Sequence, residues 1–432
     1  MKDKSSVKEH IKTVIIILLI ISMVFLGWQS RIFSGTAAGN TIFSGLFGKS
    51  GTTESGGFDN ERNYAVYSSF EIARPSCIVI TNAGGEHYGV KYDFSELVSV
   101  YERTGSIFCE AIGTSGKFTE INKKAWESAL QAVNVYFEYY MPMRLDILSY
   151  CMNEETPAGL GITEVKRMAV AIVDGVSRLY FCSEQTGKCY MSETSISAES
   201  ILSRIGLQTN SAISFAFEKS SDFIDSIRYQ VIFDNIEEYP IVVSDNPLRD
   251  RNIEDFVLTQ LGINLSSASN YTEADGTEVF VGSDFTLRLK SDGNLAVKIT
   301  EQPLGRGSEM TPGEIVGFAW QTVSGCVSGT VGEASVFLES YEEKGDESIV
   351  TFQYAAAGGR VNVLGDGFAA KVIVENDEIS EITLNLRKFE ITNEMIHLLP
   401  ALQSVAAAGE EIIINYTDMG LGRLEPKWVH AY

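Results

Sequence analysis

The chain has 432 residues, of which 44% are hydrophobic, and a formal net charge of −23 at pH 7. The first 12 residues carry a net charge of +2, which leaves −25 on the remainder. A body this acidic repels nucleic-acid phosphates and disfavours a polybasic membrane-surface mode, so we exclude nucleic acid as a partner, and the length suggests two or three domains.

The N-terminus carries an apolar run of 16 residues from Thr13 to Trp28. As a helix this run is about 24 Å long, and flanking apolar residues extend it toward the roughly 30 Å of a hydrocarbon core. A signal peptide has a shorter apolar region of about 7–15 residues and then a small-residue cleavage site, whereas Gln-Ser-Arg follows here. We therefore predict a retained transmembrane anchor over residues 13–33.

The charges around this run predict its orientation. Four lysines precede it and a single arginine directly follows it. By the positive-inside rule, residues 1–12 form a cytoplasmic tail and the bulk of the chain is extracytoplasmic. No second run of comparable length follows, so we expect a single-pass protein of the cell membrane.

One stripe of the predicted anchor is a candidate interface with another transmembrane helix. Helices associate in lipid through close packing and hydrogen bonds rather than through hydrophobic gain. The stripe consists of Thr13, Ile16, Leu19, Ile20, Met23 and Gly27. A helix that only anchors the chain is the alternative.

After the predicted anchor, residues 34–60 form a glycine-rich flexible linker, with seven glycines in 27 residues and a span of roughly 30 Å.

Residues 61–225 are predicted to form an N-terminal α+β domain. The run ARPSCIVIT (73–81) is typical of a strand, and the Asp93–Glu96 segment is typical of a capped helix start. A second helix presents one apolar face at spacings of three and four. That face consists of Trp126, Ala129, Leu130 and Val133.

Strands and a short helix complete this domain. The runs VYFEYYMPM, VKRMAVAIVDG, SRLYFCS and KCYMSE are predicted to be strands joined by hairpins. The segment 197–206 is predicted to be a helix with Ile201, Leu202 and Ile205 facing inward. The fold class is α+β.

Two of the six cysteines form a candidate disulfide. With 184–187 as a hairpin loop, Cys182 and Cys189 face each other across two strands. A bond requires Cα atoms about 4.4–6.8 Å apart, and two unpaired half-buried thiols are the alternative. Without a CxxC motif and with only four histidines, the sequence predicts no metal site.

The rest of the chain repeats one pattern, a helix followed by an antiparallel meander. The middle unit, 226–310, opens with a helix over 253–261 and contains hairpin turns at Asp275-Gly276 and Asp292-Gly293. Its successor, 311–432, opens with a capping box formed by Thr311-Pro-Gly-Glu314. The body is thus an α+β fold of repeated helix–meander units whose strand edges are available to a partner strand.

The C-terminal end is predicted in the same way. A last helix begins at Thr392, contains His397 and stops near Gly409, and two strands follow. Trp428 lies in the final strand, with Pro426 favouring an edge position. We expect the indole to be buried and to hold the terminus in the sheet, so that Trp428→Ala destabilises the final unit by about 3–5 kcal/mol.

No catalytic, cofactor-binding or metal site is predicted. The three histidines beyond the anchor, His87, His397 and His430, are far apart, and no nucleophile-elbow, zinc, P-loop or dinucleotide motif occurs. We therefore expect a protein that is not an enzyme and needs no cofactor. An extracytoplasmic hydrolase built on paired carboxylates is an alternative, which would require raised carboxyl pKa values in a cleft.

The overall plan resembles the YycH/YycI regulatory proteins of two-component systems in Gram-positive bacteria. The residues that carry the resemblance are the anchor KTVIIILLIISMVFLGW, the strand ARPSCIVIT, the helix–meander units and the terminal LEPKWVHAY. The length and the long linker are closer to YycH than to the smaller YycI type.

The resemblance implies a non-enzymatic modulator of a membrane-bound sensor histidine kinase that controls cell-wall metabolism. It also implies transmembrane contacts with that kinase, and a second YycH/YycI-type protein as a further partner. The alternative is an anchored binding module, similar to PepSY-type inhibitors, that recognises a peptide or a cell-wall ligand.

Overall fold

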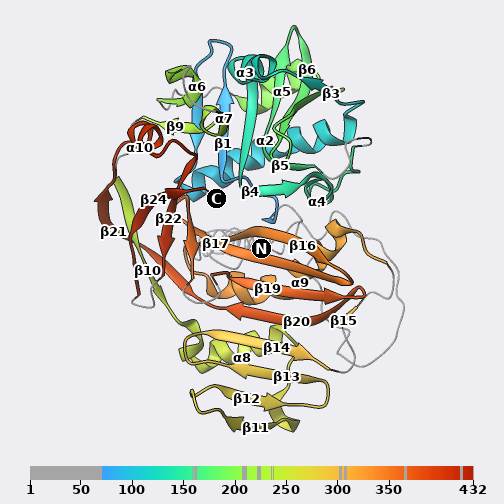
Figure 1. Ribbon diagram of the computed structural model, residues 1–432, viewed down its shortest axis with the longest axis vertical. Helices are drawn as coiled ribbons and strands as arrows, with labels where there is room; N and C mark the ends of the chain where they lie inside the picture. The colour runs from blue at the N-terminus through green and yellow to red at the C-terminus, as the bar shows by residue number, and fades with distance from the viewer. Residues whose placement is uncertain are drawn as a thin grey trace, which may run out of the picture. The chain divides into compact units, whose positions relative to one another are not determined.

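We describe the protein from a computed structural model. The structure describes residues 71–157, 159, 163–206, 212–220, 225–234, 236, 238–300, 304–305, 309–363, 367–418 and 422–431, which belong to one compact unit. The predicted tail, anchor and linker, residues 1–60, lie outside these ranges. The described part is a sheet-rich α+β fold, as expected from the sequence (Figure 1).

The N-terminal part contains a seven-stranded antiparallel sheet in the order β2-β1-β4-β5-β6-β7-β3. Its strands are β1 (Cys77–Thr81), β2 (His87–Val90), β3 (Thr119–Ile121), β4 (Val133–Arg144), β5 (Glu164–Val173), β6 (Val176–Ser183) and β7 (Cys189–Glu193). Its helices are α2 (Phe94–Thr114), α3 (Lys123–Gln131), α4 (Leu145–Cys151) and α5 (Ala198–Ile205).

Both faces of this sheet are buried, because alternate residues of its strands point to opposite sides. Ile78, Phe137 and Phe181 pack on one face in a core that includes α2. Tyr136 and Tyr180 pack on the other face with the apolar side of α3. A small hairpin also packs on this second face. The hairpin and its helices are β8 (Ile213–Phe215), β9 (Val231–Phe233), α6 (Ala216–Lys219) and α7 (Asp225–Arg228).

The predicted helix starts are confirmed in this part. The Asp93 side chain accepts a hydrogen bond from the Glu96 amide at 2.9 Å and caps α2. Two details were wrong. Val133 does not continue the face of α3 but begins β4, because the helix ends at Gln131. Leu202 is 46% exposed, since only one side of the short helix α5 meets the core.

The C-terminal part contains a 12-stranded sheet, ordered β11-β12-β13-β14-β20-β19-β17-β18-β22-β24, with β15 beside β20 and β16 beside β17. The middle and C-terminal meanders therefore share one sheet. Its strands are β11 (Ser269–Thr272), β12 (Glu278–Val281), β13 (Phe285–Leu289), β14 (Asn294–Ile299), β15 (Leu304–Gly305), β16 (Ser335–Lys344), β17 (Glu347–Ala356), β18 (Gly359–Asn362), β19 (Ala370–Glu375), β20 (Glu378–Asn385), β22 (Ile412–Thr417) and β24 (Pro426–His430).

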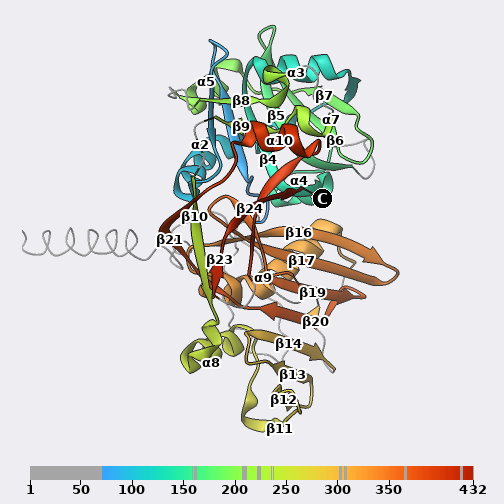
Figure 2. The ribbon, with the colours of Figure 1, turned by 60° about the vertical axis from the view of Figure 1, so that its left-hand side comes forward.

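Helices and a second small sheet accompany these strands. Helices α8 (Arg251–Gln260) and α9 (Pro312–Thr330) bury their apolar faces against the sheet, and Figure 2 shows α9 behind β17 and β19. The remaining elements are η2 (Pro247–Arg249), η3 (Leu265–Ser267), α10 (Ala401–Ala408) and the three-stranded sheet β21 (Lys388–His397), β10 (Glu238–Asp245) and β23 (Arg423–Leu424).

A capping box and two Asp-Gly turns, all predicted from the sequence, are present in this part of the structure. The capping box at Thr311 is present, with Glu314 accepting from the Thr311 amide at 2.8 Å. Gly276 and Gly293 have φ angles of 88° and 93° in their hairpin turns, where glycine adopts a left-handed backbone without a Cβ penalty. Both predicted Asp-Gly turns are therefore confirmed.

The predicted helix beginning at Thr392 was wrong. Strand β21 continues to His397, because this segment pairs with β10, and α10 begins only after Pro400. Proline is poorly accommodated inside a helix, so Pro400 marks the boundary. The stop at Gly409 is confirmed, with φ at 70°. In addition, β18 and β22 pair in parallel, unlike an antiparallel meander, because β19–β21 and α10 form a crossover between them.

Trp428 is half-buried rather than buried, because β24 is the last strand of the sheet. Its ring meets Tyr239 edge-on with centroids 5.9 Å apart, and its Nε1 donates to the Leu399 carbonyl at 3.0 Å. Pro426 opens this edge strand, as expected. The predicted burial of the indole is therefore corrected. The domain boundaries at 225 and 310 stay predictions.

Candidate functional site

An irregularity in β5 creates the most unusual charged site of the described chain. The register of β5 with β6 changes from Val165↔Ser183 to Met168↔Phe181. Lys166 and Arg167 thus both lie opposite the single residue Cys182, which defines a β-bulge. Regular alternation would send the two cations to opposite faces, but both reach the same carboxylate.

That carboxylate belongs to Glu411, the residue directly before β22. Its Oε1 atom lies 2.7 Å from Lys166 Nζ and 2.6 Å from Arg167 Nη2. Arg167 also contacts Glu138 Oε1 at 3.3 Å and Glu184 Oε1 at 3.7 Å. We call Glu138, Lys166, Arg167, Glu184 and Glu411 the ionic junction, because it joins the seven-stranded sheet to a strand of the 12-stranded sheet.

Burial makes these contacts energetically important. Lys166 is 1% exposed, and Arg167 and Glu138 are each 4% exposed. An unpaired charge in such a place loses its hydration without compensation, so each cation requires a carboxylate. Here every cation has at least one carboxylate within 3 Å. Both cations of the junction are thus charge-paired, although the buried Nε of Arg167 has no hydrogen-bond partner among the described residues.

The pKa values reflect this balance. Burial alone raises the pKa of Glu411, but Arg167 and Lys166 outweigh burial and lower it to about 2. Burial raises the pKa of Glu184, with Arg167 acting in the opposite direction. Burial lowers the pKa of the neighbouring Lys91, but Glu138, Cys77, Tyr140 and Glu411 together outweigh burial, so the net pKa is raised. The charged forms of Glu411 and Lys91 are thus favoured in the folded chain.

A backbone contact reinforces the junction. The Gln230 side chain donates to the Ile412 carbonyl at 2.8 Å and accepts from the Ile412 amide at 3.4 Å. Gln230 precedes β9 in the N-terminal part, and Ile412 opens β22. Residues 411 and 412 are therefore held by two independent sets of polar contacts.

The arrangement around His87 offers no catalytic site. Thr81 Oγ1 lies 2.9 Å from His87 Nδ1, and His87 Nε2 lies 3.2 Å from Glu218 Oε1. The three groups resemble a hydroxyl–imidazole–carboxylate chain. However, Thr81 is fully buried and donates to the Leu130 carbonyl at 3.2 Å, and Phe215 packs against the imidazole. A substrate has no access to this hydroxyl.

The other two histidines are surface residues. His397 contacts Glu238 at 2.8 Å and His430 contacts Glu410 at 3.2 Å, with both imidazoles more than half exposed. Among the described residues, no group of histidine, cysteine and acidic side chains is arranged to hold a metal ion.

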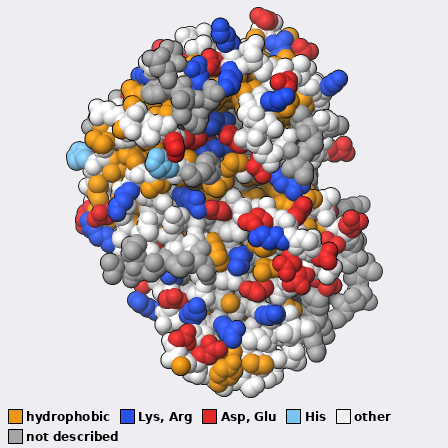
Figure 3. Space-filling view, viewed as in Figure 1, with side chains coloured by type: hydrophobic (Ala, Val, Ile, Leu, Met, Phe, Trp, Pro, Cys, Tyr) orange, Lys and Arg blue, Asp and Glu red, His pale blue; other side chains and the backbone are white. Residues whose placement is uncertain are grey.

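One edge of the large sheet is open. All four residues of β11 are exposed, including Tyr271 at 54%, and neighbouring Val281 is 40% exposed. Figure 3 shows apolar side chains gathered at the end of the molecule where Figure 1 places β11 and β12. An exposed edge strand presents unpaired backbone donors and acceptors, which a partner strand can bind.

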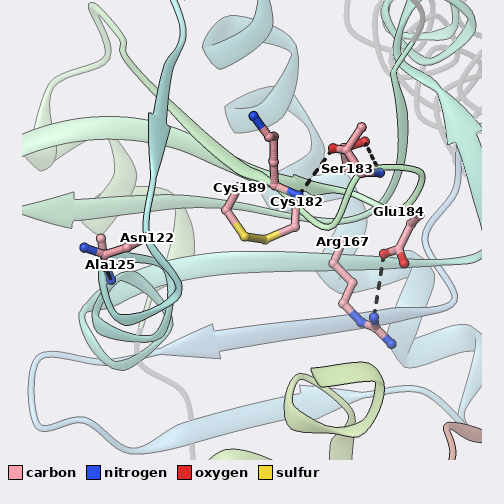
Figure 4. The surroundings of a disulfide bond; sticks show 9 residues. Asn122, Ala125, Arg167, Cys182, Ser183, Glu184 and Cys189 are labelled. Carbon is pink, nitrogen blue, oxygen red and sulfur yellow. Dashed lines mark hydrogen bonds and ion pairs between the residues drawn. A yellow bond between two sulfur atoms is a disulfide. The ribbon is translucent and has the colours of Figure 1, made fainter. Parts of the chain in front are cut away.

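Cys182 and Cys189 form a disulfide in the structure. They lie directly opposite each other in β6 and β7. Their Cα atoms are 3.9 Å apart, closer than the range of about 4.4–6.8 Å that is usual for disulfides. The bond lies next to Arg167 and Glu184 (Figure 4). The other four cysteines form no disulfide. The predicted transmembrane interface, from Thr13 to Gly27, lies outside the described residues. In the part of the chain that the structure describes, no helix is both long and apolar enough to span a membrane.

The ionic junction was not predicted from the sequence. A signal was present, because VKRMAVAIV places two cations inside an otherwise apolar strand and VYFEYY places a carboxylate inside an aromatic one. Charges in buried strands require partners. The partner Glu411 is 245 residues from Lys166, so no local pattern identifies it.

These features define a sheet-rich α+β protein whose two main sheets are joined by buried ion pairs. No family model matches the sequence, and no curated protein matches it. The fold is nevertheless YycH-like. The crystal structure of YycH from Bacillus subtilis superposes with a TM-score of 0.54 at 15% identity, over 84% of this chain and 94% of that chain. A second structure, the dehydratase domain of MlnD from Bacillus amyloliquefaciens, gives a TM-score of 0.13 at 11% identity, over 72% of this chain and 88% of that chain.

Proposed function

We propose that the protein is a membrane-anchored, non-enzymatic regulator of a sensor histidine kinase in a two-component system that controls cell-wall homeostasis. The observation that carries this proposal is the YycH-like fold, which extends over 94% of the matched YycH chain. Coverage of this extent supports the same overall protein plan rather than one shared module.

The sequence supports the membrane part of the proposal. The apolar run at 13–33, with lysines before it, suits a single-pass anchor with the folded body outside the cell. Contacts between this helix and a kinase helix would transmit regulation through the stripe from Thr13 to Gly27. The body would act as the extracytoplasmic part of the complex, together with a second YycH/YycI-type protein.

The test is crosslinking in intact membranes followed by mass spectrometry. Two full-length proteins are compared, the native chain and one in which residues 11–33 are replaced by an unrelated transmembrane helix. We expect the native chain to capture a sensor kinase and the replaced chain to lose it. Equal capture by both would move the contact to the body, and the absence of a kinase in both would overturn the proposal.

The open edge of the sheet favours a second candidate function, an anchored module that binds an extended peptide. The exposed strand β11 offers hydrogen-bonding groups, and Tyr271 and Val281 offer apolar contacts beside it. Such a module works equally well on a foreign anchor. Asn270→Pro would remove one backbone donor from β11 and impair peptide capture, whereas kinase capture through the anchor would persist.

A further inference from the structure

The disulfide lies in a lateral row that leads directly to the ionic junction. Ile121 of β3 is paired with Cys189, and Cys189 is paired with Cys182. Cys182 lies opposite the bulge of Lys166 and Arg167, and Arg167 is in turn paired with Glu138 of β4. The row thus crosses five strands, and the disulfide is its covalent link.

The hairpin that carries the bond also supplies a member of the junction. Glu184, two residues beyond Cys182, contacts Arg167, and its amide donates to the Glu164 carbonyl at 3.0 Å (Figure 4). The position of Glu184 therefore depends on how closely the end of the hairpin is held against the bulge. Backbone bonds at Ser183 close the turn, so the hairpin forms without the disulfide, but its end is then held by hydrogen bonds alone.

The bond is accessible from one side. Cys182 is half-buried and the residues of the adjoining turn, 184–188, are exposed, whereas Cys189 is 3% exposed. Cys182 is therefore the more exposed of the two bonded cysteines, and it is the one that a reductant meets first. The remaining cysteines do not compete for exchange, since burial raises the pKa of Cys109 to about 11 and of Cys151 to about 12, and Cys77 and Cys326 are buried.

We propose that the Cys182–Cys189 bond is a redox-controlled lock on the ionic junction. In the oxidised protein, the disulfide holds the end of the hairpin against the bulge, and Arg167 and Lys166 keep their ion pairs with Glu411. Reduced, it releases the hairpin end, weakens the Glu184–Arg167 contact and loosens the start of β22. The redox state of one surface hairpin thereby controls the coupling between the two main sheets.

The reducing partner is a dithiol. Its thiolate attacks the Cys182 sulfur, the disulfide breaks, and Cys189 leaves as a thiolate that takes up a proton. The second thiol of the reductant then displaces Cys182 from the mixed disulfide, and Cys182 is protonated in turn. The dithiol is oxidised to its own disulfide, and the two cysteines become thiols.

Hydrogen exchange of the purified full chain tests the lock. Exchange is measured by mass spectrometry before and after dithiothreitol. We expect reduction to speed exchange in the hairpin, 176–193, and by about threefold or more in β22, 412–417, because local opening of that strand becomes easier. Faster exchange in the hairpin with no change in β22 would overturn the proposal.

Three variants make the test specific. Cys182→Ser/Cys189→Ser is expected to exchange like the reduced protein under both conditions, and a response of this variant to dithiothreitol would contradict the proposal. Cys109→Ser, which lacks only the half-buried free thiol, is expected to respond like the native chain. Glu184→Gln is expected to retain the response in the hairpin and lose most of it in β22. These outcomes depend on the folded body alone, so they stand or fall separately from regulation of a kinase.

Discussion

Lys166 and Glu411 are 245 residues apart in the chain, and the lysine Nζ lies 2.7 Å from the carboxylate Oε1. The contact exists because a bulge in β5 turns both Lys166 and Arg167 toward one carboxylate at the start of β22. A single irregular step in one strand thus creates the polar connection between two large sheets.

Removing the shared carboxylate is expected to be strongly destabilising. Glu411→Gln removes the carboxylate that lies 2.7 Å from Lys166 and leaves Arg167 with its longer contacts to Glu138 and Glu184. Breaking a buried ion pair from one side costs about 3–5 kcal/mol, because the remaining charge is uncompensated. Urea unfolding of the purified chain measures the change.

The preceding residue provides the matched control. The Glu410 side chain is 66% exposed and pairs with the surface residue His430 at 3.2 Å. Glu410→Gln is expected to change the free energy of unfolding by no more than about 0.5 kcal/mol. Equal effects of the two substitutions would show that the buried junction stabilises the fold no more than an exposed ion pair does.

Acid is expected to weaken the same contact. The pKa of Glu411 falls from its ordinary 4.5 to about 2 in the folded chain. The unfolded chain therefore binds a proton at a higher pH than the folded chain, so the contribution is complete above about pH 5 and is lost as pH falls toward 2. Its size is on the order of 3 kcal/mol.

The comparison with Glu411→Gln isolates this group. The raised pKa of Glu184 has the opposite effect on stability. As pH rises past the ordinary carboxyl pKa toward the raised pKa of folded Glu184, the free energy of unfolding decreases, because the unfolded chain loses this proton first. Unfolding is followed from pH 6 to pH 2.5 in both proteins. We expect the native chain to lose its advantage over the variant in this range, and a constant difference between them would refute the assignment.

Helix caps, hairpin turns and the alternation of strand residues could be predicted from the sequence, because each depends only on residues that are close together in the chain. Asp93 and Thr311 cap helices through backbone amides three residues away, and the glycine of each Asp-Gly turn permits a backbone that other residues resist. Alternating residues in β4 and β6 fill two opposite cores. Each of these features needs only its neighbours in the chain.

The features that sequence reasoning missed depend on distant partners. β21 has few buried residues and no clear alternation, and it is a strand because β10 pairs with it. The junction is invisible for the same reason, since the sequence carries the charges but not their proximity. The disulfide is intermediate, because a hairpin places Cys182 opposite Cys189 without deciding whether the thiols react.

The two tryptophans Trp428 and Trp126 differ in burial, so replacing each by alanine should lower the free energy of unfolding by different amounts. The side chain is half-buried on an edge strand, so we now expect Trp428→Ala to cost about 1–2 kcal/mol rather than 3–5. Trp126 is fully buried under the N-terminal sheet, and Trp126→Ala is expected to cost about 3–5 kcal/mol. Thermal unfolding of both variants ranks them, and a larger loss at Trp428 would mean that the terminus is held more tightly than its exposure implies.

Close packing of α9 on α4 gives the last prediction. A Cβ added at Gly313 would lie 2.4 Å from Tyr150 Cβ, an atom fixed to the backbone. Gly313→Ala therefore forces the two helices apart and is expected to destabilise the chain by about 1–3 kcal/mol. The matched control is Gly329 on the same helix, where the added Cβ meets only the ring end of Phe256, which is 42% exposed and can move. Gly329→Ala is expected to be neutral or to stabilise by up to about 1 kcal/mol, because alanine favours the helix. Urea midpoints that move in the same direction for both variants would contradict close packing at Tyr150, because only that contact separates the two sites.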